Sequence, residues 1–177
     1  MAPEFALMNW TKKNILWMTA LCLLGVTCFP ANPLVLTGVL ETNFYPVLFV
    51  IGWVVWALGM TLVLSPIIMF PRHGGVPKAK SFVNTTRLVS TGTYAVVRHP
   101  QYLGGILSIF VTTLLWYPHW LLGVLGSLGT LIVYLSAREE ELDLIKQFGD
   151  DYIKYMQKVP RMNLVAGIIR LIRREIA

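Results

Sequence analysis

The sequence predicts an all-α integral membrane protein with four transmembrane helices and cytoplasmic helices at its C-terminus. Hydrophobic residues make up 55% of the 177 positions and charged residues only 14%, whereas charged residues make up about 25% of an average soluble domain. The charges gather in two blocks, residues 71–100 and 138–175, which alternate with long apolar runs. The spacing of these runs predicts helices that cross a bilayer, within one structural domain.

The positions of lysine and arginine predict the orientation of these helices. All fifteen fall at 12–13, at 72–98 or from 138 onward, and the connections at 30–44 and 117–119 contain none. By the positive-inside rule, both termini are then cytoplasmic. The basic surplus also favours contact with lipid headgroups. Nucleic-acid binding is disfavoured, because no basic helix or aromatic platform accompanies the charge.

The first two transmembrane helices are expected within residues 9–70, after a vector-derived tail at 1–8. The first is predicted at Trp10–Phe29 and the second at Phe44–Phe70. The second is longer than the roughly 20 residues needed to cross a bilayer. Two cysteines lie in the first helix, six residues apart, and this spacing indicates packing thiols rather than a disulfide or metal site.

A polar connection at residues 71–101 is expected to be a cytoplasmic linker. Pro71, Gly74–Gly75 and Pro77 are expected to break the preceding helix. An ordered turn is predicted at Leu88–Tyr94, and Pro100 suits the first turn of a new helix. A connection this long in so small a protein is usually functional.

Residues 102–177 are expected to form a membrane hairpin followed by cytoplasmic helices. Apolar helices are predicted at 102–116 and 120–137, joined by a turn at 117–119. Because one helix goes out and the next returns, the residues before and after the hairpin meet at one membrane face.

The second hairpin helix is expected to continue beyond the bilayer. Gly149 is predicted to break it, and Asp150 to cap the next turn. The segment Leu164–Ile176 has one apolar and one arginine-rich face, as is typical of a helix that lies on anionic lipid. Arg161 is expected either to contact lipid or to serve as a secondary site candidate.

Charged residues on both sides of the hairpin predict a polar binding site. Arg98 and His99 are donors suited to a carboxylate, and Glu139 and Glu140 are acceptors suited to an ammonium group, so an amino-acid zwitterion suits both halves. A sulfonium would be attracted by the same carboxylates and by tyrosine faces. Since each helical residue turns 100°, three consecutive acids cannot share one face, and Glu141 is expected in solvent.

Other kinds of catalytic site find no support in the sequence. His73, His99 and His119 do not form a metal set, since His119 is expected on the opposite membrane face. There is no glycine-rich dinucleotide motif after a strand, which excludes a soluble-type nucleotide fold. No metal is therefore expected.

Three motifs resemble the isoprenylcysteine carboxyl methyltransferase family, which is close to the membrane phospholipid methyltransferases. They are Gly92–Gly104 with its central Arg-His-Pro, Glu139–Leu142, and Phe148–Tyr155. The resemblance covers about residues 85–161. It implies S-adenosylmethionine binding at the cytoplasmic ends of the last two helices, with the linker and the C-terminal segment folded over the cofactor.

The resemblance also implies roles for individual residues. His99 with Glu140 or Glu139 would hold the amino-acid part of the cofactor, and a lipidic or amphipathic acceptor would enter laterally between helices. The cofactor-binding residues are then expected to be Tyr94, Arg98, His99, Tyr102, Gly104, Glu139, Glu140, Tyr152 and Tyr155. The catalytic candidates among them are Glu140, Arg98 and Tyr152.

Two alternatives remain open beside this interpretation. Ser136 stands where the prenylcysteine enzymes carry an arginine, which disfavours a prenylcysteine acceptor and leaves a non-catalytic four-helix membrane protein possible. A sterol-reductase-like enzyme using NADPH has a similar His-Pro region, although Gly105 stands where an acidic residue is expected in that group. The N-terminal half is shorter than in the eukaryotic members of the family that the motifs resemble, so the resemblance implies a prokaryotic cell-membrane protein.

Overall fold

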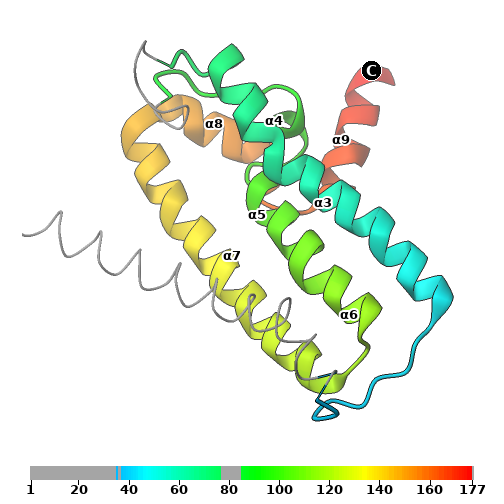
Figure 1. The fold of residues 1–177 in the computed structure, drawn as a ribbon. Coiled ribbons are helices and arrows are strands. Elements are labelled where there is room, and N and C mark those ends of the chain that lie inside the picture. Colours follow the sequence, from blue (N-terminus) through cyan, green and yellow to red (C-terminus); the bar gives the residue numbers. More distant parts are fainter. Residues whose placement is uncertain (1–34, 36, 77–84, 177) are drawn as a thin grey trace, which may run out of the picture. The chain divides into compact units, whose positions relative to one another are not determined.

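The computed structural model describes residue 35, residues 37–76 and residues 85–176 of the chain (Figure 1). The helix predicted at 10–29 and its two cysteines lie outside these residues. The described residues form helices and turns without a strand, which confirms the all-α prediction for this part of the chain. The helices are α3 (Pro46–His73), α4 (Thr93–Val96), α5 (Pro100–Gly105), the π-helix η1 (Ile106–Val111), α6 (Thr112–Trp116), α7 (Trp120–Phe148), α8 (Asp150–Lys158) and α9 (Leu164–Ile176).

Two of these helices, α3 and α7, are long and apolar enough to cross a membrane, and Pro100–Trp116 is a shorter apolar helix. Large apolar side chains along α3 and α7 are exposed, for example Val47 at 70%, Val54 at 66% and Leu131 at 54%. A helix in the core of a soluble protein would bury these side chains. Their exposure suits contact with lipid, as in a membrane protein.

The end of α3 differs from the sequence prediction. Pro71 was expected to break the helix, but it lies inside α3, which continues to His73. Pro71 lies in the last turn of α3, so the bond it cannot make and its steric conflict affect only the end of the helix. The helix ends at the two predicted glycines: the Gly74 amide donates to the Phe70 carbonyl at 2.8 Å, and Gly75 adopts a left-handed φ of 61°. Such a conformation is typical after a helix C-terminus.

Other predicted boundaries agree with the structure. The predicted turn at 117–119 separates α6 from α7, and α9 spans the predicted Leu164–Ile176. Gly149 interrupts the chain after α7 with a φ of 58°, as predicted. Asp150 was expected to cap the next helix, but Gly149 is the N-cap and Asp150 is the first residue of α8. The Asp150 charge still suits the positive end of the helix dipole.

The described residues form two compact units, and the first comprises the described residues up to 58 together with 105–139. Within it, the Trp116 indole donates to the Phe49 carbonyl at 3.2 Å, and its ring lies 5.0 Å from that of Trp53. Gly52 leaves the space that the Trp116 ring occupies. Gly126 likewise lies directly against the Phe110 ring, so its role is helix packing.

The second unit comprises residues 59–104 and those from 140 onward. Gly104 of α5 packs against the backbone of α3, since a Cβ atom at this position would lie 2.5 Å from the Gly59 carbonyl oxygen. A small core of Tyr152, Tyr155 and Val159 fixes α8 in this unit. All but one of the residues predicted to form the binding site belong to this unit; the exception is Glu139.

Substitution of Gly104 should destabilise the protein. In Gly104→Ala the new methyl group meets backbone atoms of α3 at 2.5–2.8 Å, which cannot move as a side chain can. We expect a loss of about 1–3 kcal/mol in the free energy of unfolding, measured as a lower melting temperature in detergent. The matched control is Gly105→Ala, where nothing lies within 4 Å of the added atom. Equal melting temperatures for the two variants would contradict this packing.

Candidate functional site

The Glu141 carboxylate lies at the centre of an ion-pair cluster in the second unit. Its side chain is 2% exposed, and Oε1 lies 3.0 Å from Nη2 of Arg98. Arg161 donates twice to the same carboxylate, from Nε to Oε1 at 2.9 Å and from Nη2 to Oε2 at 2.5 Å. Two guanidinium groups therefore compensate one buried negative charge, in the bidentate geometry that favours arginine over lysine.

This cluster overturns one expectation from the sequence and narrows another. Glu141 was expected in solvent and is the most buried of the three consecutive acids. Arg161 was expected as a lipid contact or a secondary site candidate, and its guanidinium binds Glu141. The sequence contains a pattern that indicates the burial of Glu141. Val133 and Ala137 are buried on α7, and Glu141 follows them at the same four-residue spacing. Residues four apart share a helix face.

Backbone pairing brings the two arginines to Glu141. The Arg98 amide donates to the Pro160 carbonyl at 3.0 Å, and the His99 amide donates to the Arg161 carbonyl at 3.1 Å. The residues just before each pair, Val97 and Val159, have extended backbones and buried side chains. The end of the linker and the turn after α8 are thus held side by side.

Beside the cluster, His99, Tyr102 and Glu140 form a second group. The Tyr102 hydroxyl donates to Oε2 of Glu140 at 2.6 Å, and Nδ1 of His99 lies 3.9 Å from the same oxygen. The His99 ring is buried and stacks on Tyr102, with ring centroids 5.4 Å apart. The Glu140 side chain remains 28% exposed. Glu140 is therefore fixed in position, yet accessible to a small molecule.

Several buried polar atoms near Glu141 and Glu140 have no hydrogen-bond partner among the described residues. They are Nε of Arg98, Nε2 of His99 and the Tyr152 hydroxyl. Nε2 of His99 lies 3.3 Å from Glu141 Oε1, close enough for attraction but outside hydrogen-bond geometry. Buried polar groups are usually satisfied. Three unsatisfied donors together indicate a place where a polar ligand could bind.

The buried tyrosines are hydrogen-bond donors rather than bases. The Tyr155 hydroxyl donates to the Tyr94 carbonyl at 2.6 Å, and the Tyr94 hydroxyl donates to Gln101 at 2.9 Å. Burial is the largest cause that raises the pKa of Tyr94, Tyr152 and Tyr155 above its ordinary value. For Tyr152 the nearby Glu141 charge raises the pKa further. All three hydroxyls therefore stay protonated at neutral pH.

Two predicted site residues do not belong to the group of side chains around Glu140 and Glu141. Glu139 is exposed on α7, and it belongs to the first compact unit. Gly104 is buried against the α3 backbone, so its structural role is close packing. Among the described residues, no group of histidine, cysteine and acidic side chains could hold a metal ion.

The sequence is similar to a family of methyltransferases and to individual members of it. Residues 47–151 match the family model described as phospholipid methyltransferase. A protein-S-isoprenylcysteine O-methyltransferase of Rattus norvegicus is 34% identical over 135 residues, which is 68% of this chain and 45% of that protein. A methanethiol S-methyltransferase of Pseudomonas deceptionensis is 27% identical over 117 residues, 63% of this chain and 42% of that protein.

A third relative matches over a shorter region. Methanethiol S-methyltransferase 1 of Bradyrhizobium diazoefficiens is 36% identical over 66 residues, which is 37% of this chain and 22% of that protein. The chain thus spans less than half the length of these three relatives. No solved structure matches it significantly.

Neutralising Glu141 should destabilise the fold far more than neutralising Glu139. Glu141→Gln leaves two largely buried guanidinium groups without their counter-charge, which typically costs about 3 kcal/mol or more. For a chain of this size we expect the melting temperature to fall by roughly 6–12 °C. Glu139→Gln, the same change on an exposed neighbour, should alter stability by less than about 0.5 kcal/mol. Similar melting temperatures for both variants would refute the assigned role of Glu141.

Proposed function

Because the chain belongs to the phospholipid methyltransferase family, we propose that it is a methyltransferase that uses S-adenosylmethionine. Its acceptor is a lipidic or amphipathic molecule at the cytoplasmic face of a prokaryotic cell membrane. The names of the relatives, which specify isoprenylcysteine and methanethiol, support methyl transfer as the reaction type. Charge placement along the sequence supports four membrane crossings with both termini cytoplasmic.

The main support for the proposal is the environment of Glu140. Its carboxylate is held by Tyr102 and is partly exposed, and no arginine forms an ion pair with it among the described residues. The adjacent Glu141 is compensated by Arg98 and Arg161. Negative charge at Glu140 is therefore available to a cationic ligand. S-adenosylmethionine, when bound, supplies a methyl group on a positively charged sulfur.

The donors around Glu140 suit the other end of the same ligand. The amino-acid part of S-adenosylmethionine carries a carboxylate, and His99 Nε2, Arg98 Nε and the Tyr152 hydroxyl are buried groups without a hydrogen-bond partner among the described residues. We assign the carboxylate to these donors and the ammonium group to Glu140. Charge-assisted hydrogen bonds of this kind are the stronger ones in proteins.

The remaining site residues position these groups. Tyr102 orients Glu140 through its hydroxyl and His99 through ring stacking. Tyr155 ties α8 to α4 by its bond to the Tyr94 carbonyl. Arg98 has a second role besides its Nε donor: its Nη2 binds Glu141, which helps to fix the backbone that carries His99.

The protonation state of the site tyrosines excludes them as bases that activate the acceptor. Burial raises the pKa of the site tyrosines, so they cannot take a proton from the acceptor at neutral pH. A carboxylate or a thiolate needs no such base. Methyl transfer is then an in-line displacement whose rate depends on holding donor and acceptor at attack distance. Lateral entry between helices would deliver a lipidic acceptor to that position.

Glu140→Gln should weaken S-adenosylmethionine binding at least about tenfold, because a charge-assisted hydrogen bond is worth about 1.5–3 kcal/mol. The measurement is isothermal titration calorimetry on the detergent-purified chain, with its melting temperature checked. Asp143→Asn is the control, since Asp143 lies on the same helix and is 52% exposed. Unchanged affinity in Glu140→Gln, with binding intact in the unmodified protein, would rule out the proposed site.

A second measurement separates methyl transfer from the alternatives. The chain is incubated with radiolabelled methyl donor and total membrane lipid, and a labelled lipid product is expected. In parallel, S-adenosylhomocysteine should raise the melting temperature, because a ligand that binds only the folded state stabilises it. Stabilisation by NADPH alone would favour a reductase. Stabilisation by S-adenosylhomocysteine without labelled product would favour a non-catalytic protein.

A further inference from the structure

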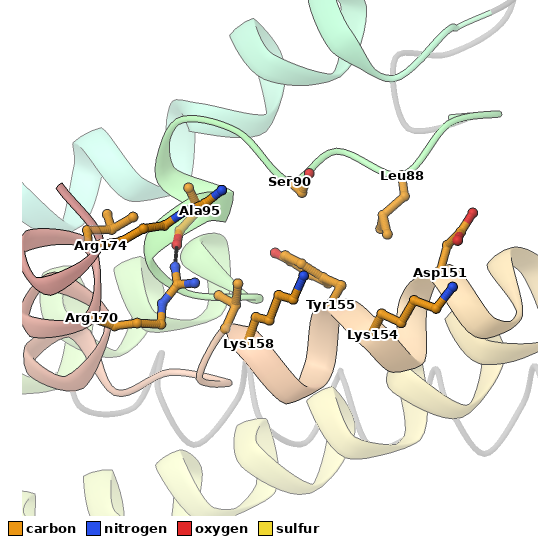
Figure 2. Close-up of a pocket in the computed structure, with 11 residues that line it drawn as sticks. Leu88, Ser90, Ala95, Asp151, Lys154, Tyr155, Lys158, Arg170 and Arg174 are labelled. Atoms are coloured by element: carbon orange, nitrogen blue, oxygen red, sulfur yellow. Dashed lines mark hydrogen bonds between the residues drawn. The ribbon is translucent and has the colours of Figure 1, made fainter. Parts of the chain in front are cut away.

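The second unit contains a cavity whose lining does not include His99 or Glu140. Its volume is about 270 Å³, near the lower limit for small-molecule sites. Figure 2 shows Leu88 and Ser90 of the linker on one side, residues of α8 on the other, and arginines of α9 at one end. Of the proposed cofactor-binding residues only Tyr155 lines it.

The cavity has a strongly basic lining. Lys154 and Lys158 of α8 and Arg170 and Arg174 of α9 line it, against a single acid, Asp151. Each cation pair is separated by four residues, so each helix presents both of its cations on one face. Within the described residues, none of the four forms an ion pair with a carboxylate at 4 Å or less. The lining therefore has an excess of three positive charges.

Arg170 is fixed in the cavity wall. Its Nη2 donates to the Ala95 carbonyl, as the dashed line in Figure 2 marks. Its Nε is buried and has no hydrogen-bond partner in the part of the chain that the structure describes. Gly167 packs directly against Val96, which holds α9 on α4. The cavity thus has a positioned cation with an unused donor, rather than only mobile surface lysines.

The opposite face of α9 indicates where this cavity lies in the cell. Val165, Ile169, Ile172 and Ile176 form an apolar stripe and are exposed by 45% to 81%. A helix with such a stripe and arginines on its other face lies in the membrane interface, at the depth of lipid headgroups. Anionic headgroups attract basic side chains there by about 1 kcal/mol for each lysine or arginine.

We propose that the basic cavity between the linker, α8 and α9 binds the phosphate group of an anionic phospholipid headgroup. The lipid is a ligand of this cavity and not the methyl acceptor, so the proposal does not rest on methyl transfer. Bound phosphate would join Lys158 of α8 to Arg174 of α9 through charge-assisted hydrogen bonds. It would thereby hold the two C-terminal helices together at the membrane surface.

Binding of short-chain lipids tests this site and its ligand. Dihexanoyl phosphatidylglycerol, dihexanoyl phosphatidylcholine and inorganic phosphate are titrated separately into the detergent-purified full chain, below the micelle-forming concentration of the lipids. We expect the anionic lipid to bind more tightly than the zwitterionic lipid and inorganic phosphate. Equal binding of inorganic phosphate would support the anion site but overturn the lipid as its source. Absence of binding by all three probes would overturn the site.

Paired double variants test the location. Lys158→Gln with Arg174→Gln removes two exposed cations from the cavity, and Lys146→Gln with Arg173→Gln removes two exposed cations outside it. The cavity variant should bind phosphatidylglycerol at least about tenfold more weakly, and the control less than about twofold. Both should melt close to the unmodified protein. Equal weakening in both variants would mean nonspecific surface attraction and would overturn the proposal.

Discussion

The buried carboxylate of Glu141 is the constraint on which the second unit depends. A lone charge at a position only 2% exposed would be strongly unfavourable. Arg98 and Arg161 supply the compensating charges, and they come from segments more than sixty residues apart. Loss of either guanidinium would leave charge uncompensated. The linker and the turn after α8 must therefore both be in place whenever this unit is folded.

This ion-pair cluster separates a structural role from a binding role among adjacent residues. Helical geometry turns each successive side chain by 100°. Glu139 is exposed, Glu140 is partly exposed beside Tyr102, and Glu141 is buried. Because Glu141 binds both arginines, Glu140 has no arginine partner among the described residues, and in the proposed site its charge serves the ligand. Glu141 thus stabilises the unit, whereas the neighbouring Glu140 is the carboxylate of the proposed site.

Helix α8 connects the two charged regions of this unit. Tyr155 bonds to the Tyr94 carbonyl on the side of the proposed cofactor site and also lines the basic cavity. In the first region Glu140 is not paired with an arginine, and in the second the cations have no acidic partner, among the described residues. Such opposite electrostatic environments on one short helix suit two ligands of different charge, a cationic methyl donor and an anionic headgroup.

The sequence alone determined the features that depend on residues close together along the chain. Apolar runs and glycines predicted the turn at 117–119, the break at Gly149 and α9, and the motif around His99 indicated the region of the proposed site. Only the tertiary structure decided that Arg98 and Arg161 are the groups that bind Glu141. Hydrophobic periodicity and backbone conformation are local and can be read along the chain. The pairing of distant charges depends on which segments meet after folding, and no local pattern specifies that.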